Sequence, residues 1–131
     1  DYLADRGALF ATDTYTDAWR HDNFLIDPKD PFAAYADRLL TVYTNRGVAW
    51  RAQHIVELVD EYRIDGLLIH SNHSCKYNSL GQVDINEAVR ERIGIPALLF
   101  EADQADGRFF NEEQTRSRVE AFLEMLAQRK N

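Results

Sequence analysis

The chain has 131 residues, of which 45% are hydrophobic, 11% aromatic and 28% charged, a composition typical of one globular domain. Its formal net charge of −7 at pH 7 argues against a nucleic-acid-binding surface, which would need a basic stripe. A single cysteine excludes an intrachain disulfide framework, and the apolar runs are too short to span a bilayer, so we expect a cytoplasmic protein without a membrane partner.

The first half of the chain predicts one strand and two helices. Residues 7–12 form an apolar run that is typical of a buried strand. Residues 31–44 begin with a proline at a first-turn position and carry apolar residues at helical spacing. Residues 49–63 show the same periodicity, with Ile55, Val56, Val59 and Tyr62 on one face.

The second half predicts strands over residues 65–70 and 96–100 and helices after each of them. Residues 83–93 place Ile85, Ala88 and Val89 on one face, and Gly94 supplies a helix stop. In the last helix Asn111 is the expected N-cap and Gln114 completes a capping box. Its expected buried face consists of Val119, Phe122, Leu123 and Leu126.

The resulting order β-α-α-β-α-β-α predicts a three-layer α/β domain, with a short parallel sheet flanked by helices, like half of a Rossmann or flavodoxin fold. Sites in such sheets form outside the carboxyl ends of the strands. Residues 13–30, 71–82 and 101–111 are the loops expected there.

The loop after the second predicted strand carries the most chemistry. Residues 70–81 read HSNHSCKYNSLG and include Cys75 with His70 and His73 nearby. Cys75 could be a small buried hydrophobe. It could also be a thiolate nucleophile, with one histidine as base and Asp13 or Glu101 as the orienting carboxylate. The spacing His70-x-x-His73-x-Cys75 also permits a metal site, although it is not one of the usual zinc arrangements and lacks a fourth ligand.

Two acidic segments follow the first and third predicted strands. Asp13 and Asp17 could act as acid and base, or simply as turn and cap residues. Glu101, Asp103 and Asp106 could bind a cation, but their spacing does not match a calcium loop. The sequence alone does not decide between these interpretations of the two acidic segments.

Several segments together resemble the C-terminal region of the 2-hydroxyacyl-CoA dehydratase / benzoyl-CoA reductase family. They are residues 65–76 (DGLLIHSNHSCK), 79–82 (SLGQ), 92–96 (RIGIP), 101–103 (EAD), 110–116 (FNEEQTR) and 119–122 (VEAF). The similarity is strongest over about residues 64–124. The chain departs from the family pattern at Tyr77-Asn78, where members commonly have Pro-Tyr.

The resemblance implies a subunit of two α/β domains and a helical part, which holds a [4Fe–4S] cluster through three cysteines. Cys75 aligns with one of these cysteines, and the other two lie upstream of the matching region. The absence of an initial Met agrees with this, and we expect the chain to be the C-terminal domain of a larger subunit. Alone, it should be inactive and hold no intact cluster.

The family chemistry implies three kinds of partner: a paired subunit, an ATP-dependent activator iron–sulfur protein and an acyl-CoA substrate. The activator passes one electron to the cluster; a dehydratase then expels hydroxide through a ketyl radical, whereas a reductase reduces an aromatic ring. The polar residues expected to bind the cluster sulfides or the thioester are Ser71, Asn72, Ser74 and Ser79. The alternatives are a benzoyl-CoA reductase subunit and a non-catalytic Rossmann-like binding or subunit-interaction domain.

Overall fold

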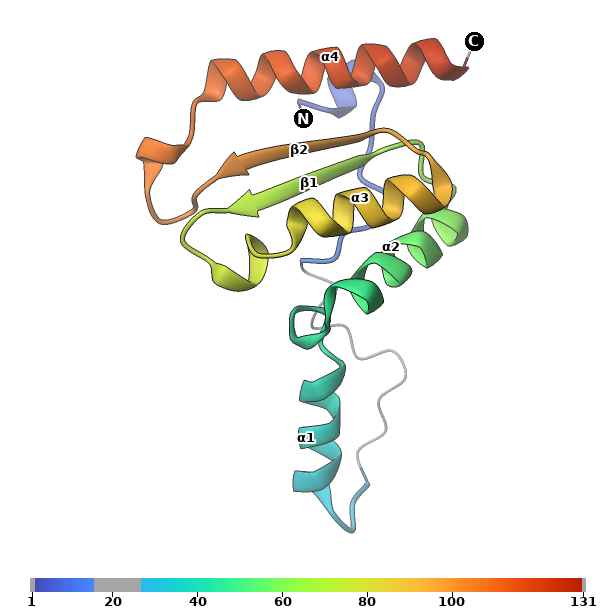
Figure 1. Ribbon diagram of the computed structural model, residues 1–131, viewed down its shortest axis with the longest axis vertical. Helices are drawn as coiled ribbons and strands as arrows, with labels where there is room; N and C mark the ends of the chain where they lie inside the picture. Colours follow the sequence, from blue (N-terminus) through green and yellow to red (C-terminus); the bar gives the residue numbers. More distant parts are fainter. Residues whose placement is uncertain (1, 16–26, 131) are drawn as a thin grey trace.

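A computed structural model describes residues 2–15 and 27–130 and has the predicted α/β class (Figure 1). Its α-helices are α1 (Pro31–Thr41), α2 (Val48–Tyr62), α3 (Gln82–Ile93) and α4 (Glu112–Lys130), and its strands are β1 (Leu67–Asn72) and β2 (Ala97–Ala102). Short 3-10 turns are η1 (Ala4–Arg6), η3 (Tyr43–Asn45), η4 (Lys76–Asn78) and η5 (Gly107–Phe109).

The two strands form a parallel sheet with α3 as the crossover. Their register runs from Leu67 opposite Ala97 to Asn72 opposite Ala102. Helix α4 lies on one side of the strands, and α2 and α3 lie on the other, which gives three layers (Figure 1). Both strands therefore end at the same edge of the sheet, and the loops that follow them are neighbours.

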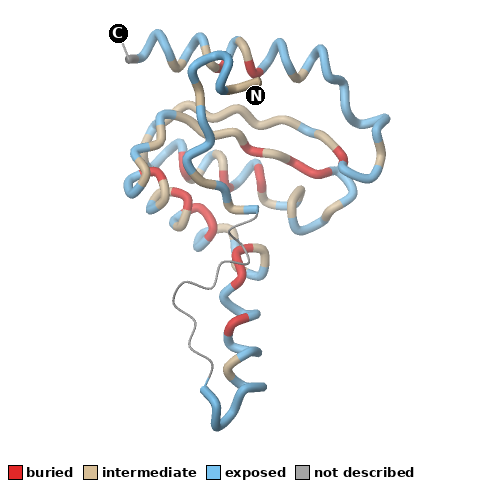
Figure 2. The backbone as a smooth tube through the Cα atoms, turned by 180° about the vertical axis from the view of Figure 1, so that it is seen from behind, coloured by how far each residue is buried: buried red, intermediate tan, exposed pale blue. Residues whose placement is uncertain are grey.

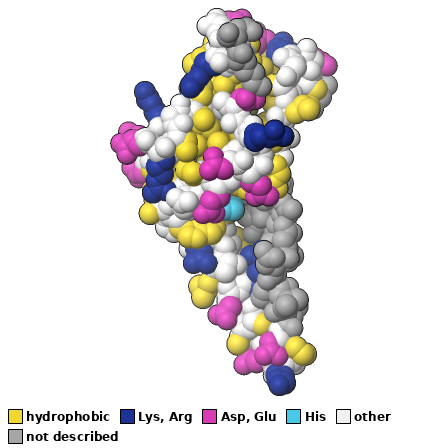
Figure 3. All heavy atoms as spheres, turned by 90° about the vertical axis from the view of Figure 1, so that its right-hand side faces the viewer, with side chains coloured by type: hydrophobic (Ala, Val, Ile, Leu, Met, Phe, Trp, Pro, Cys, Tyr) yellow, Lys and Arg dark blue, Asp and Glu magenta, His cyan; other side chains and the backbone are white. Residues whose placement is uncertain are grey.

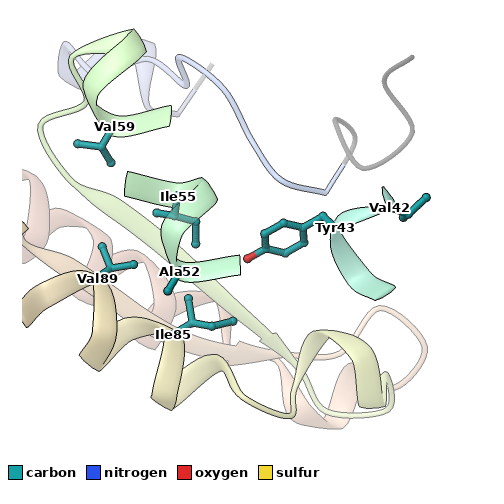
Figure 4. Close-up of a cluster of buried hydrophobic side chains, with 7 residues drawn as sticks. All are labelled: Val42, Tyr43, Ala52, Ile55, Val59, Ile85 and Val89. Atoms are coloured by element: carbon teal, nitrogen blue, oxygen red, sulfur yellow. The ribbon is translucent and has the colours of Figure 1, made fainter. Parts of the chain in front are cut away.

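The main core lies between α2, α3 and η3. Ala52 and Ile85 are completely buried and face each other across the two helices, and Val89 packs one turn further along (Figure 4). These apolar residues recur every three or four positions, so each helix has one buried face. Most of the buried residues accordingly lie on α2, α3 and β1 (Figure 2).

The predicted helix ends are confirmed where their signals are local. The carboxylate of Asp30 accepts a hydrogen bond from Ala33 N at 3.0 Å, with Pro31 in the first turn of α1. Asn111 Oδ1 accepts from Gln114 N at 3.0 Å at the start of α4. Gly94 ends α3 with a left-handed φ of 62°, a conformation that side chains disfavour.

The strand predicted over residues 7–12 is wrong. In the part of the chain that the structure describes, the sheet has two strands, and residues 7–12 belong to neither. Leu9 and Phe10 remain 82% and 70% exposed. A strand needs a neighbour to receive its backbone hydrogen bonds, and hydrophobicity alone does not supply one.

The predicted bounds of other elements shift by a few residues. Helix α1 stops at Thr41 because Val42 is extended, with ψ of 134°, and the chain then turns through η3. The apolar face of α1 stays largely open to solvent, with Phe32 86% exposed and Tyr35 55% exposed. Strand β1 begins two residues later than expected, at Leu67.

Charged side chains of both signs lie on the surface of the protein. On the face shown in Figure 3, acidic and basic side chains are interspersed, and no continuous basic patch is visible. Within the described ranges, no helix combines the length and the apolar character that crossing a membrane requires.

Candidate functional site

Cys75 lies in the loop after β1, at the carboxyl edge of the sheet. It is half-buried and stands directly before η4, outside the apolar core. Its backbone N–H donates to Asn72 O at 3.0 Å, and its carbonyl accepts from Asn78 N at 3.0 Å. The Asn78 Nδ2 group donates to the Cys75 Sγ at 3.5 Å. The thiol is therefore neither a core hydrophobe nor a freely moving surface group.

Asp103, in the loop after β2, connects that loop to the Cys75 loop. Its Oδ2 accepts from Ser74 N at 2.7 Å, and its Oδ1 accepts from Ala105 N at 2.8 Å and from Asp106 N at 3.1 Å. Hydrogen bonds from the Ser74 side chain and then from these backbone groups hold the pKa of Asp103 below its ordinary value. The carboxylate is consequently ionised at neutral pH.

Gln82, the first residue of α3, holds the other end of the Cys75 loop. It is buried, and its Nε2 donates to His70 O at 3.1 Å and to Asn78 O at 3.3 Å. One amide group thus links β1 to the turn η4. Because Asn78 also contacts the sulfur, Gln82 supports the residue that orients Cys75.

The histidines do not assemble with Cys75. The His70 ring stacks on Phe100 and Tyr15, and its Nε2 lies 3.3 Å from Ala102 O. His73 is exposed and stacks on Phe109 with ring centroids 4.2 Å apart. Across residues 2–15 and 27–130, no three His, Cys, Asp or Glu side chains come together as metal ligands. A zinc site of that composition is therefore not formed.

The other predicted polar residues lie at the same edge with different exposure. Ser71 and Asn72 are buried at the end of β1, whereas Ser74 is exposed and Ser79 half-buried. The Asn72 Oδ1 is buried and has no hydrogen-bond partner among the described residues.

The acidic candidates separate into different roles. Asp13 accepts from Tyr15 N at 2.7 Å, a local turn contact, and Asp17 lies outside the described residues. Glu101 is exposed on β2. Asp106 bonds Arg108, whose side chain is the main reason that the pKa of Asp106 is lowered. The oxygens of Asp103 accept hydrogen bonds from backbone N–H groups. Glu101, Asp103 and Asp106 therefore do not form a cation site.

The sequence did not predict which residues fix the Cys75 loop: Asp103, Gln82 and Asn78. For Asp103 there was a local signal, since an aspartate often accepts backbone N–H groups two or three residues later. Its contact to Ser74 joins residues 29 positions apart and had no local signal.

Cys75 is the one side chain here whose chemistry suits an iron–sulfur cluster. Cysteine thiolates are the usual ligands of such clusters, and Cys75 lies at an accessible sheet edge next to an amide donor. The chain has one cysteine, so it can supply one thiolate and not a complete ligand set. The residues present fit the role of a single ligand.

Comparison with known proteins identifies the family. The family model for the 2-hydroxyglutaryl-CoA dehydratase D-component matches residues 1–126. A benzoyl-CoA reductase subunit of Thauera aromatica is 33% identical over 129 residues, which cover 97% of this chain and 30% of that protein. The (R)-2-hydroxyisocaproyl-CoA dehydratase alpha subunit of Clostridioides difficile is 30% identical over 128 residues, 98% of this chain and 30% of that protein.

A third relative matches a shorter part of the chain. The alpha subunit of (R)-2-hydroxyglutaryl-CoA dehydratase from Acidaminococcus fermentans is 36% identical over 93 residues, 71% of this chain and 19% of that protein. In all three comparisons the chain spans less than a third of the relative's length.

Proposed function

Because the chain belongs to the 2-hydroxyglutaryl-CoA dehydratase D-component family, we propose that it is an α/β domain of an iron–sulfur 2-hydroxyacyl-CoA dehydratase subunit and that Cys75 is one ligand of a [4Fe–4S] cluster. The proposed reaction removes water from a 2-hydroxyacyl-CoA after one-electron activation. The remaining thiolate ligands come from other parts of the subunit, so this chain alone holds no intact cluster.

The position of Cys75 is the observation that supports this proposal. A cluster ligand must present its sulfur to a neighbouring part of the protein, and Cys75 is half-buried at the sheet edge where α/β proteins bind their ligands. A structural cysteine would lie in the apolar cluster of α2 and α3, and Cys75 does not belong to that cluster.

In this proposal the residues around Cys75 orient and tune the sulfur. When bound, the cluster would supply the single electron that the reaction requires. The side-chain N–H of Asn78 approaches the sulfur and partly offsets its negative charge, and Gln82 and Asp103 fix the two ends of the loop. The buried oxygen of Asn72, which has no hydrogen-bond partner among residues 2–15 and 27–130, is a candidate acceptor for a donor group of the substrate or of another domain.

A second candidate function is reduction of an aromatic acyl-CoA. It is favoured by the alignment with the benzoyl-CoA reductase subunit of Thauera aromatica, which covers 97% of this chain at 33% identity. Two of the relatives are named as alpha subunits, which supports a paired subunit in either case, and an ATP-dependent activator protein is the proposed electron donor. The two functions share the proposed role of Cys75.

The proposal is tested with the natural subunit that contains this sequence, prepared without oxygen. The Cys75→Ala variant should lose most of its iron and acid-labile sulfide, whereas the matched control Lys76→Ala, at an exposed neighbouring position, should keep both. Normal iron and sulfide in Cys75→Ala would refute the ligand assignment. Activated enzyme supplied with a 2-hydroxyacyl-CoA or with benzoyl-CoA distinguishes the two reactions.

A further inference from the structure

We propose that Asp103 is a positioning residue for Cys75: its carboxylate fixes the loop after β1 to the loop after β2 and thereby sets where the sulfur is presented. The inference rests on the proposed function in assigning Cys75 as a cluster ligand. The contact that carries it is the hydrogen bond from Ser74 N to Asp103 Oδ2, which joins two residues of this chain.

The carboxylate divides its two oxygens between the two loops. Oδ1 accepts from Ala105 N at 2.8 Å and Asp106 N at 3.1 Å, which shapes the turn that follows β2. Oδ2 accepts from Ser74 N at 2.7 Å, in the loop after β1. A bond from His73 N to Ala102 O at 3.3 Å lies beside it. The two loops are therefore joined immediately before Cys75.

The environment of Asp103 makes this contact specific for an ionised carboxylate. The side chain is 7% exposed, and a carboxylate removed from water needs hydrogen bonds to its charged form. Backbone N–H groups of both loops and the Ser74 side chain provide them, which also lowers the pKa of Asp103. With its lone pairs occupied, Asp103 acts by holding the backbone and not as a general base.

The contact constrains the sulfur through the adjoining peptide. Ser74 N is held by Asp103, and Cys75 N is held by Asn72 O at 3.0 Å, so both amides that flank the Ser74 Cα are fixed. That backbone places the Cα of Cys75, and the Asn78 Nδ2 group contacts the sulfur itself. Metal and cluster ligands require positions accurate to about half an ångström, so a free loop would place the thiolate poorly.

The sharpest variant is Asp103→Asn. Its amide keeps one oxygen, which can serve the two N–H groups of Ala105 and Asp106, and its NH2 group must then face the Ser74 N–H without accepting from it. Asp103→Ser is a second variant, because a serine hydroxyl can still cap the turn but is too short to reach Ser74. The matched control is Asp106→Asn. The carboxylate of Asp106 accepts hydrogen bonds from Arg108 and makes none to the Cys75 loop.

The first measurement uses the natural subunit that contains this sequence. Hydrogen exchange of the Ser74 amide should be faster by about tenfold or more in Asp103→Asn and Asp103→Ser than in the unmodified chain, and unchanged in Asp106→Asn. Circular dichroism should show that both variants keep the fold. An unchanged Ser74 exchange rate in the folded variants would overturn the inference regardless of any cluster.

The second measurement uses the natural subunit prepared without oxygen. Asp103→Asn should lose about half or more of its iron, or keep its iron with an altered electron paramagnetic resonance spectrum, while Asp106→Asn matches the unmodified subunit. If Cys75→Ala loses the cluster and Asp103→Asn has normal iron and an unaltered spectrum, the positioning inference fails alone. If Cys75→Ala keeps the cluster, the proposed ligand role fails, and the inference falls with it.

Discussion

Replacing Gln82 by leucine should destabilise the domain by removing the amide that links β1 to η4. Gln82 Nε2 donates to His70 O at 3.1 Å and to Asn78 O at 3.3 Å from a buried position. Leucine has a similar volume but no donor, so both carbonyl groups lose a partner. The two backbone segments that enclose Cys75 then lose this side-chain link and keep only packing and the backbone hydrogen bonds of Cys75 to Asn72 and Asn78.

The size of the loss follows from the two hydrogen bonds. Each contributes about 0.5–1.5 kcal/mol net, so Gln82→Leu should lower the free energy of unfolding by about 1–3 kcal/mol. Gln82→Glu should cost more at pH 7, because its carboxylate faces two carbonyl oxygens. Burial and these oxygens raise the folded-state pKa of the new carboxyl group above its unfolded value, so the deficit should shrink as pH falls through that folded-state pKa.

Urea unfolding followed by circular dichroism measures these differences by linear extrapolation. The matched control is Gln53→Leu on the exposed side of α2, where the glutamine donates to Glu57 of its own helix and accepts from Arg92 of α3 at the surface. That control should stay within about 0.5 kcal/mol of the unmodified chain. If Gln82→Leu loses no more stability than Gln53→Leu, the linking role assigned to Gln82 is incorrect.

Three further predictions concern the core and the site. Ile85→Ala, at a completely buried position between α2 and α3, should lower the free energy of unfolding in urea by about 2–5 kcal/mol, and a loss under about 1 kcal/mol would contradict the packing. Because the pKa of Asp103 is lowered from 3.8, the stability that its charge contributes is present above that pH and is lost as pH falls through the folded-state pKa. The unfolding temperature of Asp103→Asn should therefore be lower than that of the unmodified chain at neutral pH and equal to it in strong acid. A difference in unfolding temperature that does not change with pH would contradict this. Asn78→Leu in the natural subunit should lower the midpoint potential of the cluster by about 20–60 mV, since an N–H donor to sulfur favours the reduced state, and an unchanged potential in redox titration would exclude that role.

The elements that sequence could predict are those whose causes lie within a few residues. Helix α3 shows this: Ile85 and Val89 mark its buried face, and Gly94 provides its left-handed end. Residues 7–12 show the opposite case, because their hydrophobicity indicates burial but a strand requires a partner from elsewhere. Likewise, helical spacing in α1 predicts an apolar face and does not say whether anything covers it, and Phe32 remains exposed.

The site also has one feature that the sequence could predict and one that it could not. The rule for strand ends predicted that the loops after β1 and β2 meet, and the Asp103–Ser74 contact confirms it. The role of Asp103 was not predictable, because an acidic residue after a strand fits a cation site, a turn or a base equally well. Only the pairing of residues far apart in the chain reveals that its oxygens are occupied by backbone N–H groups.

The register of the sheet connects the core to the presentation of Cys75. Asn72 lies opposite Ala102, so Ser74, two residues after Asn72, and Asp103, one residue after Ala102, come close to each other just beyond the strands. One residue of slip would move the two loops by about 3.3 Å relative to each other, more than the Asp103–Ser74 hydrogen bond can tolerate. The register is in turn maintained by the apolar packing of α3 against α2 and β1, where Ile85 is buried and Leu67 packs against the same cluster. A core substitution that shifts β1 along β2 should therefore disturb the sulfur without touching it, and a core substitution that only loosens packing should not.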